Sequence, residues 1–284
     1  MPDPLSALTD LVAGGGVAVL SGAGLSTESG IPDYRGPTGA ARKFAPMTYQ
    51  TFTRDAAARR RYWARSHVGW QVMDRAEPNA GHQAVAALQR AGLVSAILTQ
   101  NVDGLHQAAG ARNVVELHGS IDRVVCLGCG QTTTRTELAA RLRAANPGFA
   151  ALVLGVNPDG DVDLDDAAVE AFRPVDCLRC RAGLLKPDVV FFGESVPVER
   201  VDHCFAAVAD ARALLVLGSS LTVMSGRRFV LRAAKLGIPV AIVNQGETRG
   251  DPYAAVKVDA PLGTVLPALS RALTLAQSGS GNSP

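Results

Sequence analysis

The sequence has no long hydrophobic run. Its apolar stretches, such as residues 213–217, are no longer than a short strand, whereas a helix that crosses a membrane needs about 20 apolar residues. The first residues, Met1-Pro2-Asp3-Pro4, also lack the basic patch and apolar stretch of a secretory signal and the Arg- and Ser-rich pattern of an organelle signal. We therefore expect a cytoplasmic protein that has no membrane partner.

The sequence also has little net charge. Its 28 basic and 26 acidic residues give a formal charge of +2, which is too small and too scattered for a nucleic-acid surface. The one cluster of arginines, within residues 54–65, is typical of a solvated helix face. No Gly-x-Ser-x-Gly elbow occurs, so a serine hydrolase of that type is excluded. We therefore expect no nucleic-acid partner. We also expect a monomer.

What the sequence does contain is an alternation of short apolar runs and helical patterns over 284 residues. The runs are apolar at nearly every position, which is typical of strands buried on both faces of a parallel sheet. They lie at residues 17–20, 94–98, 114–117, 189–192, 213–217 and 239–243, and helices are predicted at 82–90, 198–212 and 225–236. This pattern predicts an α/β fold with a doubly wound, Rossmann-like parallel sheet.

Two stretches interrupt the alternation and predict a second, smaller domain. Residues 36–77 are rich in Arg, Tyr and Trp and read as a helical insertion, and residues 123–185 begin and end with a cysteine pair. We therefore assign residues 1–35, 78–122 and 186–276 to the Rossmann-like domain. The smaller domain comprises the helical insertion and a module at 123–185, and the Gly- and Ser-rich residues 277–284 form a flexible tail.

Cysteine is scarce, and four of the five cysteines form two Cys-x-x-Cys pairs, Cys126 with Cys129 and Cys177 with Cys180. In a reducing compartment such pairs point to a metal before they point to disulfides. Two pairs supply the four thiolates of a tetrahedral structural zinc site, and no histidine lies nearby to suggest a catalytic one. We predict one structural zinc ion, with a redox dithiol as the alternative.

A glycine turn follows the first predicted strand. Gly22 and Gly24 match the first two glycines of the dinucleotide fingerprint G-x-G-x-x-G, but Thr27 stands at the third position. Glycines there let the backbone approach a pyrophosphate, and a helix after the turn would offer its N–H groups to the anion. The acidic residue expected about 20 positions later is absent. A nucleotide should therefore bind, but not as it does in an ordinary dehydrogenase.

Polar residues follow four further strands. They are the segment 99–106 (Thr-Gln-Asn-Val-Asp-Gly-Leu-His), the segment 116–119 (Glu-Leu-His-Gly), the segment 218–220 (Gly-Ser-Ser) and Asn244. Ligands of open α/β sheets bind outside the carboxyl ends of the strands. We therefore expect these groups to meet in one crevice with the glycine turn.

These motifs, in this order, resemble the sirtuins, which are NAD-dependent protein-lysine deacylases. The resemblance rests on the segment 22–35 (Gly-Ala-Gly-Leu-Ser-Thr-Glu-Ser-Gly-Ile-Pro-Asp-Tyr-Arg), the two segments at 99–106 and 116–119, the cysteine pairs, and the segment 186–194 (Lys-Pro-Asp-Val-Val-Phe-Phe-Gly-Glu). It covers about residues 5–275. Within the family, the long insertion between the cysteine pairs and the segments 62–65 and 68–70 resemble the lipoamidase and ADP-ribosyltransferase-type mitochondrial branch and its bacterial relatives.

The resemblance implies that NAD binds in the crevice as a co-substrate. The residues that it assigns to the phosphates, the ribose and nicotinamide pocket, and the adenosine half are Gly22, Ala23, Gly24, Thr27, Asp33, Arg35, Gln100, Asn101, Val102, Asp103, Gly218, Ser219, Ser220, Asn244, Gln245 and Leu262. Val102 replaces the Ile of many members, and Gly-Ser-Ser replaces the commoner Gly-Thr-Ser; both changes are conservative. Asn101 and Asp103 are also implied to take part in catalysis.

The resemblance also implies that His118 is the general base. In the reaction, the acyl oxygen of the modified lysine attacks the ribose carbon that carries nicotinamide, and a ribose hydroxyl then attacks the resulting imidate. That hydroxyl needs a proton acceptor, and an imidazole with a pKa near 6.5 is suitable. The expected products are free lysine, nicotinamide and O-acyl-ADP-ribose. The other four histidines are expected to be surface, packing or structural residues, and Cys204 a small buried apolar residue.

Substrate residues are implied at two places. Val190, Phe192 and Gly193 belong to a segment whose backbone is expected to pair with the acylated peptide. Tyr62 and Arg65 lie three positions apart on a predicted helix, and a Tyr-x-x-Arg pair in desuccinylase-type sirtuins recognises the carboxylate of acidic acyl groups. A guanidinium and a phenol suit that task. The alternative is that Arg65 belongs to a solvated Arg-rich face.

Two alternatives to deacylation of protein lysine remain open. The same NAD pocket would serve a protein mono-ADP-ribosyltransferase, which differs only in the acceptor. A non-catalytic NAD-binding module is the second alternative, and the presence of Asn101 and His118 argues against it.

Overall fold

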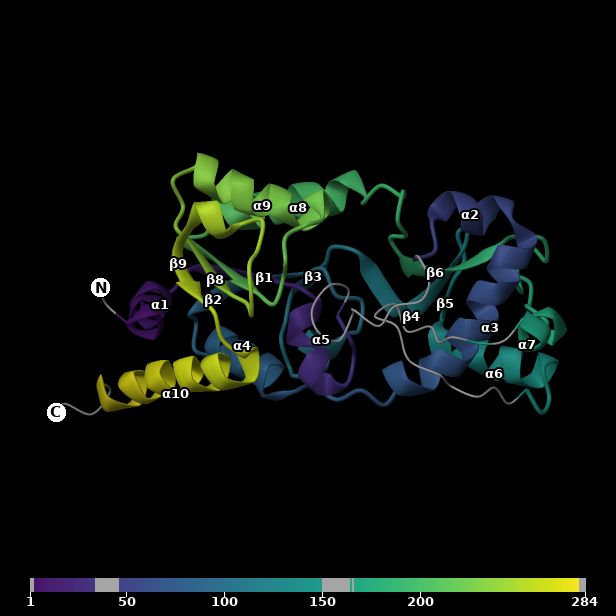
Figure 1. The fold of residues 1–284 in the computed structure, drawn as a ribbon, viewed down its shortest axis with the longest axis horizontal. Coiled ribbons are helices and arrows are strands. Elements are labelled where there is room, and N and C mark those ends of the chain that lie inside the picture. The colour runs from purple at the N-terminus through teal and green to yellow at the C-terminus, as the bar shows by residue number, and fades with distance from the viewer. Residues whose placement is uncertain (1–2, 34–45, 150–163, 165, 281–284) are drawn as a thin grey trace.

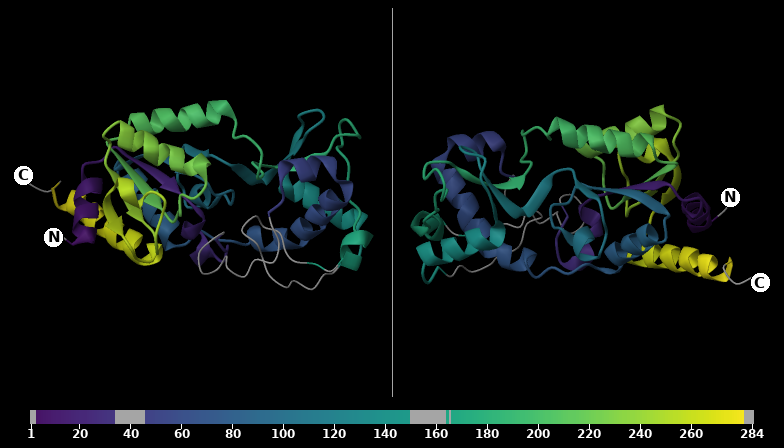
Figure 2. Two further views of the ribbon diagram at one scale, coloured as in Figure 1. Left: turned by 45° about the horizontal axis from the view of Figure 1, so that its top comes forward. Right: turned by 180° about the vertical axis from the view of Figure 1, so that it is seen from behind.

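The computed structural model describes residues 3–33, 46–149, 164 and 166–280 of the chain. Its strands form two sheets, one of six strands and one of three. Figures 1 and 2 show that the six-stranded sheet and its helices make up one end of the molecule, which carries both termini, and that the three-stranded sheet lies at the other end among α2, α3, α6 and α7.

The larger sheet has the strand order β3-β2-β1-β7-β8-β9, and every neighbouring pair is parallel. Its strands are β1 (Val17–Ser21), β2 (Val94–Thr99), β3 (Val114–Glu116), β7 (Ala213–Leu217), β8 (Val240–Val243) and β9 (Ala254–Val258). Every residue of β1, β7 and β8 is buried. Helices cover both faces, which explains why these strands are apolar at consecutive positions.

Helices α1 (Pro4–Ala13), α4 (Ala80–Arg90) and α10 (Leu262–Ser280) pack on one face of this sheet, and α8 (Val198–Ala209) and α9 (Met224–Lys235) pack on the other. Figure 1 shows α8 and α9 above the sheet and α4 and α10 below it. The short helix α5 (Leu105–Ala108) follows β2. Among the described residues, no helix combines the length and the apolar character that crossing a bilayer requires.

The smaller unit has an antiparallel sheet of order β5-β4-β6, made of β4 (Gly119–Cys126), β5 (Thr132–Thr134) and β6 (Leu185–Val189). Its helices are α2 (Tyr49–Arg54), α3 (Ala56–Met73), α6 (Arg135–Ala145) and α7 (Asp166–Ala171). One hydrophobic cluster joins α2 and α3 to the strands and helices between the cysteine pairs. The helical insertion and the cysteine module therefore share a core.

The doubly wound parallel sheet with a smaller second unit is confirmed, and the strand prediction at 213–217 matches β7 at both ends. The predicted strand at 189–192 is wrong: β6 ends at Val189, because the chain turns where Glu194 N–H donates to Phe191 O and the Glu194 carboxylate accepts from Phe191 N–H. Strands β4, β5 and β9 were not expected, since their exposed and polar positions break up the apolar pattern.

The helix expected after the glycine turn is also wrong. Two short 3-10 helices, Ala23–Leu25 and Thr27–Ser29, follow the turn instead. Gly30 ends the second one in a left-handed conformation, with φ of 82°, and Pro32 follows closely. Since neither segment is an α-helix, no α-helix dipole is available at this turn, and an anion there would rely on individual backbone and side-chain groups.

Candidate active site

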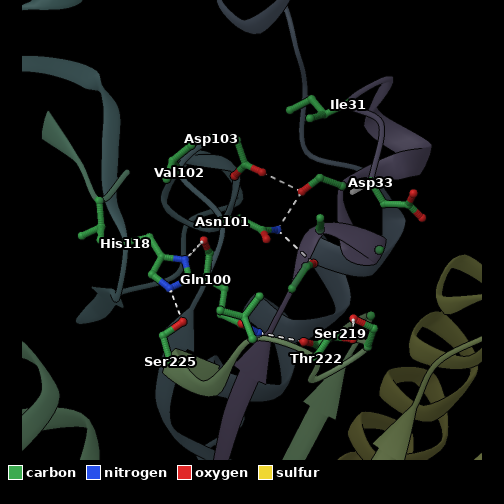
Figure 3. Close-up of a pocket in the computed structure, with 18 of the residues that line it drawn as sticks. Ile31, Asp33, Gln100, Asn101, Val102, Asp103, His118, Ser219, Thr222 and Ser225 are labelled. Atoms are coloured by element: carbon green, nitrogen blue, oxygen red, sulfur yellow. Dashed lines mark hydrogen bonds between the residues drawn. The ribbon is translucent and has the colours of Figure 1, made fainter. Parts of the chain in front are cut away.

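A cavity of about 940 Å³ lies at the carboxyl ends of β1, β2, β7 and β8, where the larger sheet meets the segment after β6. Figure 3 shows side chains from these strand ends pointing toward one another in it. Nearly all of the predicted cofactor, catalytic and peptide-binding residues line this cavity. They are Gly22, Ala23, Gly24, Thr27, Asp33, Gln100, Asn101, Val102, Asp103, His118, Val190, Phe192, Gly193, Gly218, Ser219, Ser220, Asn244, Gln245 and Leu262. Arg35 lies outside the described residues.

The glycine turn is packed tightly against the end of β7. Gly22 N–H donates to Leu217 O at 2.9 Å, and Gly24 N–H donates to Gly218 O at 2.9 Å. A Cβ atom at Gly24 would lie 2.9 Å from the Cα atom of Gly218, and a Cβ at Gly22 would lie 2.8 Å from Gly218 O. Both neighbours are backbone atoms, so a side chain at either glycine would force the two strand ends apart.

Asn101 and Asp103 are joined through the Ser26 hydroxyl. Asn101 Nδ2 donates to Ser26 Oγ at 3.0 Å and to Gly22 O at 3.1 Å, and Ser26 Oγ donates to Asp103 Oδ2 at 2.6 Å. These bonds connect the loop after β2 to the 3-10 turns after β1 (Figure 3). Burial raises the pKa of Asp103, and the bonds from Ser26 and from Leu105 N–H oppose that rise.

Gln100 and Ser219 connect the ends of β2 and β7. The Gln100 amide Nε2 donates to Ser219 Oγ at 2.8 Å. A Cβ at Gly226, in the first turn of α9, would lie 2.3 Å from Gln100 Oε1. The absence of a side chain at Gly226 therefore leaves the room that the Gln100 amide occupies.

His118 lies between β3 and β4, with both ring nitrogens in hydrogen bonds. Nδ1 is 2.9 Å from Gln100 O, and Nε2 is 2.8 Å from the Ser225 hydroxyl (Figure 3). Burial lowers the pKa of His118, the bond to Gln100 O opposes this, and the positive charges of Arg200 and Arg228 lower the pKa further. The imidazole is therefore neutral near pH 7 and able to accept a proton.

Two other histidines form a buried pair next to the end of β1. The rings of His82 and His106 have centroids 5.2 Å apart. His106 Nε2 is 2.9 Å from Ser21 Oγ, and His82 Nδ1 is 3.1 Å from Asn79 Oδ1. Burial lowers the pKa of His82 to about 4 and, together with the nearby His82, that of His106 to about 3. These histidines are neutral, buried groups, in agreement with the structural role predicted for them.

The segment after β6 borders the cavity and is held by a buried ion pair. Lys186 Nζ lies 3.0 Å from Glu194 Oε2, and the Lys186 side chain is 4% exposed. The same carboxylate oxygen accepts from Phe191 N–H at 2.8 Å. Phe192 O accepts from Tyr49 N–H at 2.9 Å, so part of this backbone already pairs with the start of α2.

Tyr62 and Arg65 are not among the described residues that line the cavity. The Tyr62 side chain is buried in an aromatic cluster, with ring centroids 5.4 Å from Phe52 and 5.3 Å from Phe191. The Tyr62 ring therefore belongs to the hydrophobic core of the smaller unit. Recognition of an acidic acyl group by this pair stays a prediction, and the position of Tyr62 does not favour it.

Several lining residues were not predicted, among them Ser26, Ile31, Ser225 and Arg228. Ser26 stands inside the segment 22–35 that carries the resemblance, so a hydroxyl two residues after Gly24 was a usable signal. Ser225 and Arg228 lie on α9, which reads in the sequence as an ordinary covering helix. Only the packing of α9 against the sheet brings its first turn to the cavity.

The four paired cysteines lie together at one end of the smaller unit. Their Sγ atoms are all within 4.8 Å of one another, with Cys126 and Cys180 at 3.6 Å and Cys129 and Cys177 at 3.7 Å. In a tetrahedral site with Zn–S bonds of about 2.3 Å, sulfur atoms lie about 3.8 Å apart. A Cβ at Gly183 would lie 2.1 Å from Cys126 Sγ, so the chain leaves room for this cluster. The set can bind one zinc ion.

Comparison with known proteins agrees with this geometry. The profile of the Sir2 family matches residues 22–225. An NAD-dependent protein deacetylase 1 of Streptomyces coelicolor is 60% identical over 271 residues, covering 95% of this chain and 90% of that protein. An NAD-dependent protein deacetylase 1 of Mycobacterium avium is 54% identical over 272 residues, covering 94% and 95%.

Solved structures show the same likeness. One described as a structural basis for the mechanism and regulation of Sir2 enzymes has a TM-score of 0.77 at 32% identity, covering 97% of this chain and 100% of that chain. A Sir2–p53 peptide–NAD⁺ complex has a TM-score of 0.75 at 29% identity, covering 96% and 98%. The family profile spans most of the chain, and the relatives match almost its whole length. The chain belongs to the Sir2 family.

Proposed function

We propose that this protein is an NAD-dependent protein-lysine deacylase, which converts an acylated lysine and NAD to free lysine, nicotinamide and O-acyl-ADP-ribose. The observation that carries the proposal is that neutral His118 faces the same cavity as the hydrogen-bonded Asn101, Ser26 and Asp103. The similarity to proteins named NAD-dependent protein deacetylases supports it.

The glycine turn and the strand ends would hold the dinucleotide. Gly22 and Gly24 leave the backbone bare beside Gly218, so that a pyrophosphate can approach it closely. Ser219, Ser220 and Asn244 line the part of the cavity at the ends of β7 and β8 and would contact the adenosine half. Asn101 and Asp103 would hold the ribose and the nicotinamide end, where their mutual bonds through Ser26 fix their positions.

His118 would take the proton of the attacking ribose hydroxyl. A carbonyl oxygen only accepts hydrogen bonds, so Nδ1 of His118 carries the hydrogen that faces Gln100 O, and Nε2 holds the lone pair. Burial keeps the ring neutral and thus ready to accept. General-base help of this kind typically contributes about 10² to 10⁴ in rate.

The acylated peptide would lie along Val190, Phe192 and Gly193, and the four cysteines would hold a structural zinc. The buried ion pair of Lys186 and Glu194 supports the peptide segment, because the same Glu194 oxygen accepts from Phe191 N–H. The zinc would act on folding alone, because the cysteines belong to the smaller unit and are not among the described residues that line the cavity.

The test is a panel of acyl-lysine peptides incubated with NAD and purified protein. Acetyl, long-chain and acidic acyl groups should be compared, with nicotinamide release and the deacylated peptide both measured by mass. Removal of at least one acyl group, coupled one to one to nicotinamide release, is the expected result. ADP-ribose attached to protein without deacylation would instead indicate a mono-ADP-ribosyltransferase, and intact NAD would overturn the proposal.

The same panel tests the acidic-acyl prediction for Arg65. If Arg65 recognises a distal carboxylate, Arg65→Met should slow removal of succinyl and glutaryl groups and leave acetyl removal unchanged. Equal rates for Arg65→Met and the unmodified protein on every peptide would show that this arginine has no part in acyl selection.

A further inference from the structure

Ser225 contacts the imidazole that we propose to be the general base. It is the second residue of α9, and its hydroxyl oxygen lies 2.8 Å from Nε2 of His118. The contact joins residues that are 107 positions apart in the chain. Figure 3 shows the two side chains pointing at each other across the edge of the cavity.

The direction of this hydrogen bond follows from the other ring nitrogen. Nδ1 of His118 faces the carbonyl oxygen of Gln100 at 2.9 Å, and a carbonyl oxygen cannot donate, so Nδ1 carries the hydrogen. In the neutral ring Nε2 is then bare. The Ser225 hydroxyl therefore donates to Nε2, and the two bonds together fix both the tautomer and the plane of the ring.

The rest of α9 holds Ser225 in place. Phe229, Val230 and Ala233 of this helix are fully buried in the core of the larger unit. A Cβ atom at the neighbouring Gly226 would lie 2.3 Å from Gln100 Oε1, so this part of α9 packs closely against the Gln100 side chain. A hydroxyl on such a rigid element can orient its partner more precisely than one on a loop.

We propose that Ser225 is a positioning residue for His118. Its hydroxyl keeps the unprotonated Nε2 directed toward the cavity until the ribose hydroxyl of NAD replaces the Ser225 hydroxyl as the donor to Nε2. The inference rests on the proposed deacylase function. When the ribose hydroxyl approaches, the Ser225 hydroxyl turns its hydrogen away from Nε2, one proton passes from the ribose oxygen to Nε2, and Ser225 Oγ then accepts a hydrogen bond from the protonated Nε2. Ser225 itself forms and breaks no covalent bond.

This role predicts an effect on one step of the reaction only. Cleavage of nicotinamide from NAD requires no base, so exchange of labelled nicotinamide into NAD in the presence of acyl peptide should not depend on Ser225. Formation of O-acyl-ADP-ribose requires deprotonation of a ribose hydroxyl, so it should depend on the orientation of His118. A purely structural role would change both rates together.

The experiment measures both rates for Ser225→Ala and Ser225→Thr. We expect Ser225→Ala to lower kcat for O-acyl-ADP-ribose about tenfold, in line with the loss of one oriented hydrogen bond, with KM for NAD and nicotinamide exchange unchanged. Ser225→Thr keeps the hydroxyl and should restore most of the rate. Ser95→Ala is the matched control, because its hydroxyl donates to Val17 O at the opposite end of the sheet.

The outcomes separate this inference from the function on which it rests. If the unmodified protein shows neither exchange nor product, the proposed deacylase function fails. If it shows both and Ser225→Ala forms product at the same rate, or loses exchange and product equally, the role of Ser225 is wrong. If the Tm of Ser225→Ala shows that this variant does not fold, Ser225→Cys replaces it. A thiol is a weak donor, so the same loss of product formation is expected.

Discussion

The Ser26 hydroxyl donates a 2.6 Å hydrogen bond to Asp103 and accepts one from Asn101 at 3.0 Å. Ser26→Ala removes both bonds, leaves the Asn101 amide with Gly22 O alone, and raises the pKa of Asp103 further because the Ser26 bond opposes its desolvation. We expect NAD to bind about tenfold more weakly, which is about 1.4 kcal/mol. Isothermal titration calorimetry measures this change.

The control for Ser26→Ala lies one 3-10 turn away. The buried Ser29 hydroxyl has no hydrogen-bond partner among the residues that the structure describes, so Ser29→Ala should leave NAD affinity unchanged. Equal affinity of Ser26→Ala and Ser29→Ala for NAD would show that the link between Asn101 and Asp103 does not organise the pocket.

His118→Ala should abolish release of free lysine and leave NAD binding largely intact. The imidazole accepts a proton in the step that we assign to it, and it contributes little to the glycine turn or to the ends of β7 and β8. A deacylation assay and a binding isotherm on the same preparation separate the two effects. His203→Ala, which changes an exposed residue of α8, is the control. An active His118→Ala variant would overturn the assignment.

Chelation of zinc should unfold the smaller unit. Purified protein should contain one zinc per chain, and removal of it should lower the Tm and abolish deacylation together, since binding of a structural metal is part of the folding free energy. Cys177→Ser should lose the zinc. Cys204→Ala should keep it, because Cys204 is buried beside α9 and outside the cluster. Full activity of zinc-free protein would contradict a structural role.

Lowering the pH below 6.5 should destabilise the protein through His82 and His106. Their pKa values in the folded chain, about 4 and about 3, lie below the value near 6.5 of an unfolded histidine. The unfolded chain therefore binds more protons, so the stabilisation is complete above pH 6.5 and is lost as the pH falls through the folded values of about 4 for His82 and about 3 for His106. Each histidine should contribute a slope of up to about 1.4 kcal/mol per pH unit.

Denaturant titrations between pH 7 and 5 measure this slope on zinc-loaded protein. His106→Gln should show a shallower decline than the unmodified chain, because one buried titrating group is gone. His203→Gln should show the same decline, since His203 is exposed. A slope that His106→Gln leaves unchanged would assign the acid sensitivity to other groups.

The parallel sheet was predictable because strands such as β1 and β7 are apolar at almost every position, as strands buried on both faces of a sheet are. The polar residues at their carboxyl ends could be placed in one crevice for the same reason. The end of β6 was not predictable, since Phe191 and Phe192 continue the apolar run and the chain turns through hydrogen bonds between Glu194 and Phe191. Ser225 was missed because contacts between distant segments leave no periodic signal.

Tyr62 shows the limit of an argument from spacing. Three positions on a helix place Tyr62 and Arg65 on the same side, but spacing does not say what that side faces. The structure places the Tyr62 ring against Phe52 and Phe191. The packing of the smaller unit decides which residues a helix face contacts. The order of residues in the chain does not predict that packing.

Val190 N–H donates to His118 O at 2.8 Å, and the next residue, Gly119, pairs with Val189. The backbone that carries the imidazole is thus hydrogen-bonded to the backbone that would carry the peptide. A change in the spacing of these two backbones would require this pairing to break, so the distance from the base to the bound lysine is set by hydrogen bonds of the chain itself. The register of this β-ladder therefore fixes how far the imidazole lies from the bound lysine.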